Sequence, residues 1–173
     1  MLKRYLSFIA ILAATLCAAH GAIAADPAPD PLAAIQGMVG NWEGTGKGPF
    51  GPYYVKWSAI REGRWIVTYQ DIYDKQGGTA QEHVVHVYGV DLNGKLTCDT
   101  YDGTGKYQMT GEATATGGKM RAEDGGMWRE FTWTTDGDTI SGVFHLHNPN
   151  AKDPFPKDFE ATETDHRLPA SGN

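Results

Sequence analysis

The chain has 173 residues, of which 40% are hydrophobic and 21% charged, and its formal net charge at pH 7 is −6. The acidic balance and the lack of a basic cluster exclude nucleic acid as a partner and make an anionic membrane surface repulsive. A chain of this length can bury the core of a single domain.

The first residues have the pattern of a signal peptide. Lys3 and Arg4 precede an apolar run over residues 6–16, and Ala22 and Ala24 give the small-x-small pattern at which a signal peptidase cleaves. The run is shorter than the ~20 residues of a spanning helix. We therefore expect residues 1–24 to be removed, with export to the bacterial periplasm or exterior and no integral membrane segment afterwards. The bulky Leu16 argues against lipid attachment at the following cysteine.

Residues 25–31 form a proline-rich lead-in to a short helix. Asp30 can cap this helix, and Pro31 suits its first position. Leu32, Ile35 and Met38 share one side, so the helix has an apolar face and needs a partner to pack on.

After this helix the pattern changes to a period of two residues, which is typical of strands. Glycine pairs and Asn93-Gly94 separate the strands as hairpin turns, and Gly117-Gly118 is interpreted as one of them. The loop at residues 48–52 contains two prolines. Strands are predicted from residue 40 to that loop and at residues 53–60, 65–73, 82–90, 96–101, 107–113, 119–124, 127–135, 139–147 and 159–168.

The predicted fold is all-β. No helical pattern separates the strands, which excludes parallel crossover units. A sandwich with a Greek key needs at least one long connection, so the short turns favour a closed barrel. We predict an antiparallel up-and-down β-barrel of about ten strands with a short N-terminal helix, forming a single domain over residues 32–168 with a tail at 169–173.

The glycine-rich first strand indicates a cavity or a sharp bend. Alternation sends Trp42, Gly44 and Gly46 to one face, where two positions have no side chain. Five tryptophans, eight tyrosines and six phenylalanines could line a pocket for a flat apolar guest, or could fill the barrel. The residues predicted to bind a ligand are Trp42, Gly44, Gly46, Trp57, Tyr88, Trp133 and Phe144.

Two pairs of histidines are candidates for chemistry. His145 and His147 leave the same face of a strand and could chelate a metal, but the opposite face is the apolar one, which favours surface histidines. His83 and His86 lie three residues apart, so one of them faces inward, and alternation does not decide which. An inward histidine beside Tyr88 would give an acid–base pair for an isomerase or hydrolase.

The segment around Trp42 resembles the calycin superfamily, in which a short helix precedes a G-x-W strand of an antiparallel barrel. The resemblance to lipocalins implies that Arg167 packs over Trp42 at the closed end. The longer pattern G-x-W-x-G-x-G-x-G is more similar to nitrobindin-like barrels and to a related group of secreted bacterial proteins of unassigned function. For a nitrobindin-like protein the resemblance implies haem held by a C-terminal histidine, here His166.

The leading hypothesis is an exported, non-enzymatic barrel that holds a small apolar or aromatic molecule. No glycine-flanked serine motif occurs, and Cys98 lies on an apolar face, so no catalytic residue is predicted. No metal or other cofactor is predicted besides the haem alternative. A monomer or weak homodimer is expected. A third hypothesis is an envelope interaction module with a packed lumen, whose sign would be an apolar patch outside the barrel.

Overall fold

The computed structural model describes residues 30, 32–103 and 105–169. The predicted signal peptide at 1–24, nearly all of the lead-in and most of the predicted tail lie outside the described residues. The chain begins its described part with a single 3-10 helix, η1 (Ala33–Met38). Within that part, no helix has the length and hydropathy needed to cross a membrane.

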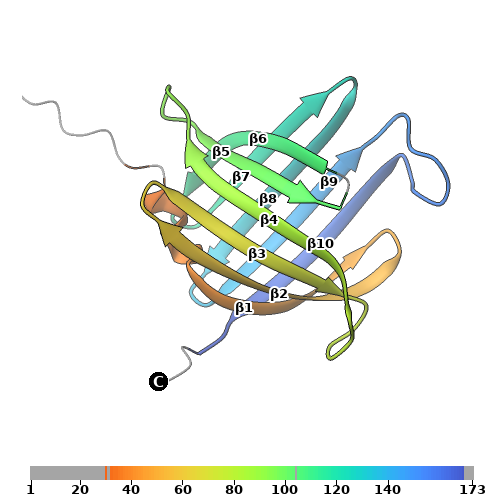
Figure 1. Cartoon of the computed structure of the whole chain (residues 1–173), viewed down its shortest axis with the longest axis horizontal. Coiled ribbons are helices and arrows are strands. Elements are labelled where there is room, and N and C mark those ends of the chain that lie inside the picture. Colours follow the sequence, from red (N-terminus) through yellow and green to blue (C-terminus); the bar gives the residue numbers. More distant parts are fainter. Residues whose placement is uncertain (1–29, 31, 104, 170–173) are drawn as a thin grey trace, which may run out of the picture.

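Ten strands close into one antiparallel barrel, in which each strand pairs with its neighbours in the sequence and the first pairs with the last (Figure 1). The predicted all-β, up-and-down barrel is therefore confirmed. The strands are β1 (Gly40–Gly48), β2 (Gly51–Glu62), β3 (Trp65–Tyr73), β4 (Ala80–Val90), β5 (Leu96–Asp102), β6 (Gly105–Thr114), β7 (Gly117–Asp124), β8 (Met127–Asp136), β9 (Thr139–His147) and β10 (Asp158–Arg167).

Two turns differ from the sequence-based prediction. The loop expected over residues 48–52 is a tight turn at Pro49 and Phe50, because Pro52 already pairs with Lys47 in the sheet. A proline lacks a backbone N–H, but near a strand end this removes little of the hydrogen bonding between the strands. Gly117 and Gly118 belong to β7, and the turn lies just before them. A Cβ on Gly118 would lie 2.4 Å from the ring of Trp133, so this glycine makes room for a side chain.

One end of the barrel is closed by η1 and Trp42. The Trp42 side chain is fully buried, and its indole N–H donates to the carbonyl oxygen of Met38 at 2.8 Å. The ring stacks on Trp57 with centroids 5.1 Å apart. The Arg167 guanidinium lies over the Trp42 ring, 4.2 Å from the ring centroid. Nη1 of Arg167 also donates to the carbonyl oxygen of Val39 at 2.7 Å. Helix, first strand and last strand are thereby joined at this end.

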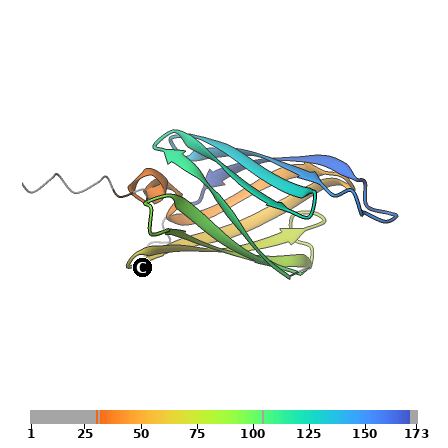
Figure 2. The same ribbon diagram turned by 90° about the horizontal axis from the view of Figure 1, so that it is seen from above.

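At the opposite, open end the barrel wall separates between β6 and β7. These strands pair only from Thr110 and Arg121 to Thr114 and Gly117. Nearer the open end β6 continues its pairing with β5, and β7 its pairing with β8, so the two strands diverge (Figure 2). The wall therefore has a side opening in addition to the open end.

Candidate functional site

The exposure of the inward-facing side chains changes along the barrel axis. On β9, Ile140 and Gly142 are buried, whereas Phe144 and Leu146, closer to the open end, are half-buried. In a closed barrel an inward-facing side chain meets solvent only through the open end or the side opening. The same change from buried to half-buried occurs on other strands, where the half-buried inward positions include Tyr53, Ile72, Phe131, Phe159 and Ala161.

The half of the interior next to η1 is packed solid. Its buried side chains include Trp42, Trp57, Tyr88 and Trp133, four of the residues predicted from sequence to bind a ligand. Phe144 is the predicted aromatic residue that lies in the half-buried part, with its ring 6.1 Å from that of Phe159. Inward-facing side chains are thus buried in one half and partly exposed in the other, which we call the accessible half.

The glycines of β1 make room for two side chains of this chain. A Cβ on Gly44 would lie 2.0 Å from Oδ1 of Asp165, and a Cβ on Gly46 would lie 2.2 Å from the ring of Tyr53. The pattern predicted space on this face, and Asp165 and Tyr53 occupy it. Contact of the two glycines with a guest stays a prediction.

Two carboxyl groups lie where the packed half meets the accessible half, and both come from β10. The Tyr53 hydroxyl donates to Oε2 of Glu163 at 3.0 Å, and the Gln70 amide donates to Oε1 at 3.2 Å. The Trp57 indole N–H donates to Oδ2 of Asp165 at 3.0 Å. Among the described residues, Oδ1 of Asp165 has no hydrogen-bond partner. We call Glu163 and Asp165 the carboxyl pair.

The carboxyl pair is held in a partly protonated state. Burial raises the pKa of Glu163 well above its ordinary value, and the neighbouring charge of Asp165 raises it further. Burial also raises the pKa of Asp165, although the hydrogen bond from Trp57 opposes this. Two adjacent carboxyl groups in such surroundings do not both ionise readily, so the pair shares a proton and has one net negative charge near neutral pH.

His86 is the inward-facing histidine, and it continues the polar layer. Its Nδ1 lies 3.0 Å from the hydroxyl of Thr100 and its Nε2 lies 3.3 Å from Oε1 of Gln70. Because the Gln70 amide nitrogen donates to Glu163, its oxygen faces the imidazole, and we assign the proton to Nε2. Burial lowers the pKa of His86 to about 4, so the ring is neutral. His83 instead faces outward, with its Nδ1 2.6 Å from Asp71.

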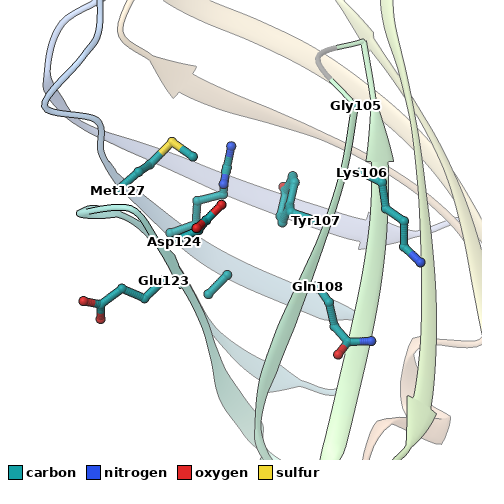
Figure 3. A pocket seen from close by; sticks show the side chains of 9 residues that line it. Gly105, Lys106, Tyr107, Gln108, Glu123, Asp124 and Met127 are labelled. Carbon is teal, nitrogen blue, oxygen red and sulfur yellow. The ribbon is translucent and has the colours of Figure 1, made fainter.

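The side opening contains a cavity of about 260 Å³ between β6, β7 and β8 (Figure 3). Tyr107, Asp124 and Met127 point into it, whereas Lys106 and Glu123 point away (Figure 3). The guanidinium carbon of Arg129 lies 4.2 Å from the centroid of the Tyr107 ring. A second cavity, of about 440 Å³, lies at the closed end beside Leu32 and Arg61.

The remaining histidine candidates are on the outer face. Nδ1 of His145 lies 3.6 Å from Glu160, and Nδ1 of His147 lies 2.5 Å from Asp158. In the described part of the chain, no three His, Cys, Asp or Glu residues are grouped so that they could hold a metal ion. His166 is exposed, with Nδ1 3.2 Å from the hydroxyl of Thr139, so a haem inside the lumen would be out of its reach.

The sequence reasoning missed the carboxyl pair, although a signal was present. By period-two alternation Glu160, Thr162, Thr164 and His166 share one face of the last strand, and the structure exposes all four. The residues between them, which include Glu163 and Asp165, must then face inward. Two acidic residues on the lumen side of a strand are unusual enough to mark a site.

The outer face of the barrel has an apolar patch across β2 to β5. Its most exposed members are Tyr69, Ile60, Tyr101 and Trp65, at 52%, 42%, 42% and 38% of full exposure. They are contiguous across the sheet. Tyr69 pairs with Val85 on the neighbouring strand, and Val85 in turn pairs with Tyr101. Ile60 pairs with Val67. We call these residues the outer patch.

Comparison with known proteins supports the fold. No protein-family model matches the chain, and no curated protein matches it. The crystal structure of Rv2717c from M. tuberculosis is similar with a TM-score of 0.61 and 16% identity, over 83% of this chain and 100% of that one. The structure of EF1p2_mFAP2b bound to DFHBI is similar at a TM-score of 0.40 and 13% identity, over 78% of this chain and 97% of that one.

At this level of identity the likeness to Rv2717c shows the fold alone. That fold is a closed antiparallel barrel, as the strand pattern predicted, and membership of the calycin superfamily, expected from Gly40 and Trp42, stays a prediction. Membership of a particular family, and the link to secreted bacterial proteins, stay predictions.

Proposed function

We propose that this protein is an exported, non-enzymatic barrel that binds a small apolar or aromatic molecule in the open half of its lumen. The observation that carries the proposal is the change of inward-facing residues from buried to half-buried toward the open end. Phe131, Phe144 and Phe159 keep apolar surface that a guest would remove from water, which contributes roughly 25 cal/mol per Å². Export is supported by the N-terminal sequence pattern.

Binding is favoured over catalysis by the state of the inward-facing groups. Both ring nitrogens of His86 are within hydrogen-bonding distance of Thr100 and Gln70, so the imidazole lacks an open nitrogen for a substrate proton. Burial raises the pKa of the Cys98 thiol to about 12, which removes the thiolate needed for nucleophilic attack. Neither group fits the acid–base or nucleophilic role that an enzyme of this fold would need.

The proposal can be tested with the neutral fluorescent probe N-phenyl-1-naphthylamine and two tryptophan variants. Ala161→Trp adds an indole on the lumen side of β10, and Thr162→Trp adds the same indole at the next residue, on the exposed outer face. We expect the native protein and Thr162→Trp to enhance and blue-shift probe fluorescence, and Ala161→Trp to lose most of this signal. An absent signal with the native protein, or equal loss in both variants, would overturn the proposal.

The outer patch supports a second candidate role, as an interaction module. A second copy of this chain is the partner that we propose, because the patch spans adjacent strands of one sheet, with the cationic groups of Arg64 and Lys106 lying against the rings of Trp65 and Tyr101. Two such faces can pack sheet on sheet. This role is compatible with a guest in the lumen.

A further inference from the structure

We infer that the guest carries a protonated amine, which the carboxyl pair binds at the base of the accessible lumen. This inference rests on the proposed function, since it names the chemistry of the guest that the same lumen would hold.

Apart from the proton that Glu163 and Asp165 share with each other, the carboxyl pair only accepts hydrogen bonds. The Tyr53 hydroxyl, the Gln70 amide and the Trp57 indole all direct their hydrogens at Glu163 or Asp165. The fourth carboxyl oxygen, Oδ1 of Asp165, is buried and has no partner among the described residues, in a residue only 3% exposed. It lies in the space that Gly44 leaves by having no side chain. A buried acceptor of this kind is satisfied by a guest that brings a donor.

The charge of the pair favours a cationic donor over a neutral one. Within the described chain, no lysine, arginine or histidine nitrogen lies within 4.0 Å of either carboxyl group. Buried carboxylates are normally paired with a cation. A bound ammonium group would supply the missing positive charge, and its three N–H donors would form charge-assisted hydrogen bonds with the carboxyl oxygens.

The wall above the carboxyl pair also suits an aromatic ammonium ion. Phe131, Phe144 and Phe159 face the lumen with partly exposed rings, and ring faces attract cations as well as other rings. A carboxylate guest would meet the negative charge of the pair in surroundings that screen charge poorly. The lumen is therefore expected to prefer an aromatic amine to an aromatic alcohol, and to reject an aromatic acid.

Three probes of nearly equal size test this preference, namely benzylammonium, benzyl alcohol and benzoate. Binding to the full-length protein is measured at pH 7 by titration calorimetry and by the fluorescence of Trp57, which donates to Asp165. We expect benzylammonium to bind about tenfold or more tightly than benzyl alcohol, because a charge-assisted hydrogen bond exceeds a neutral one by roughly that factor. Benzoate should bind more weakly than either.

Two isosteric variants localise the effect. Asp165→Asn removes the charge from the carboxyl pair, and Glu160→Gln removes one from the exposed outer face of the same strand. We expect Asp165→Asn to abolish the preference for benzylammonium over benzyl alcohol and Glu160→Gln to retain it. Circular dichroism establishes that each variant is folded, and the three-probe comparison on the native protein needs no variant.

The outcomes separate this inference from the proposed function. If N-phenyl-1-naphthylamine binds in the lumen and benzylammonium binds no better than benzyl alcohol, the amine inference is wrong and the binding function stands. The inference is also wrong if Asp165→Asn keeps the preference, or if Glu160→Gln abolishes it as fully as Asp165→Asn does. If the naphthylamine probe and all three benzyl probes fail to bind, the binding function itself is wrong.

Discussion

Glu163 and His86 are joined through one side chain, the amide of Gln70, which donates to Glu163 and accepts from His86. The two titratable groups are thus separated by a neutral group instead of forming an ion pair. Burial raises the pKa of Glu163 and lowers that of His86, so both are held in their neutral forms. Each shifted pKa makes the free energy of unfolding depend on pH, that of His86 as the pH falls and that of Glu163 as the pH rises. The two effects can be measured separately.

The first prediction concerns acid stability and His86. The pKa of this histidine falls from 6.5 to about 4 on folding, so the unfolded chain takes up a proton first as the pH falls. Stability should therefore decline between about pH 6.5 and 4, by up to about 3 kcal/mol for this residue. Urea unfolding from pH 7 to 4 measures the decline.

The matched variants are His86→Gln, which removes the buried ring, and His83→Gln, which removes an exposed one. We expect His86→Gln to be less stable than the native protein at pH 7, because it loses the hydrogen bonds of the ring with Thr100 and Gln70. On acidification, however, the variant should lose less stability than the native protein. His83→Gln should follow the native profile. Equal acid sensitivity in His86→Gln and the native protein would contradict the assignment of a buried neutral ring.

The second prediction concerns the alkaline side and Glu163. A carboxyl group whose pKa is raised on folding favours the folded state below that pKa, and this contribution is lost as the pH rises through it. Glu163→Gln keeps the shape of the protonated form without ionising. We expect the variant to lose less stability than the native protein as the pH rises above 4.5, the ordinary pKa of this side chain.

The same urea measurements over this pH range provide the readout, with Glu160→Gln as the exposed control. If Glu163→Gln loses stability with rising pH as steeply as the native protein does, Glu163 is not the group responsible.

The third prediction concerns the space beside Gly44. A Cβ there would lie 2.0 Å from Oδ1 of Asp165 and 2.3 Å from the backbone oxygen of Thr164, so the backbone itself would have to move. We expect Gly44→Ala to lower the free energy of unfolding by about 1–3 kcal/mol, as other overpacked sites do. In Gly37→Ala the added Cβ meets nothing within 4 Å, and the change should stay within about 0.5 kcal/mol.

Thermal unfolding followed by circular dichroism distinguishes the two alanine variants. A Gly44→Ala variant as stable as Gly37→Ala would mean that Asp165 can leave the space beside β1 without cost. The carboxyl pair would then be less firmly placed than its contacts indicate.

The fold could be predicted closely from the sequence because its signals are local. Hairpin dipeptides such as Asn93-Gly94 mark the turns, and period-two alternation marks the strands. The errors fall where local chemistry is ambiguous. Gly117-Gly118 has the composition of a turn, but the ring of Trp133, distant in sequence, needs the space beside Gly118.

The candidate site was harder to predict because it depends on register between distant strands. Alternation shows that Trp42 and Gly44 share a face, but not that Asp165 pairs opposite Gly44 across the closure of the barrel. In the same way, the inward-facing histidine could be identified only once the pairing of Thr68 with His86 was known. Which half of the lumen is packed depends on the whole set of side chains and has no local signal.

The last prediction concerns the outer patch and the oligomeric state. If the patch joins two copies of the chain, a charge at its most exposed ring should separate them, because Tyr69 would face an apolar partner surface. We expect sedimentation of the native protein to show a concentration-dependent dimer and Tyr69→Glu to remain monomeric. Thr164→Glu, on the exposed outer face of β10, adds the same charge away from the patch and should leave the dimer intact.

A native protein that stays monomeric at high concentration would contradict the dimer. If Thr164→Glu disrupted the dimer as strongly as Tyr69→Glu, the contact would have to lie elsewhere on the barrel.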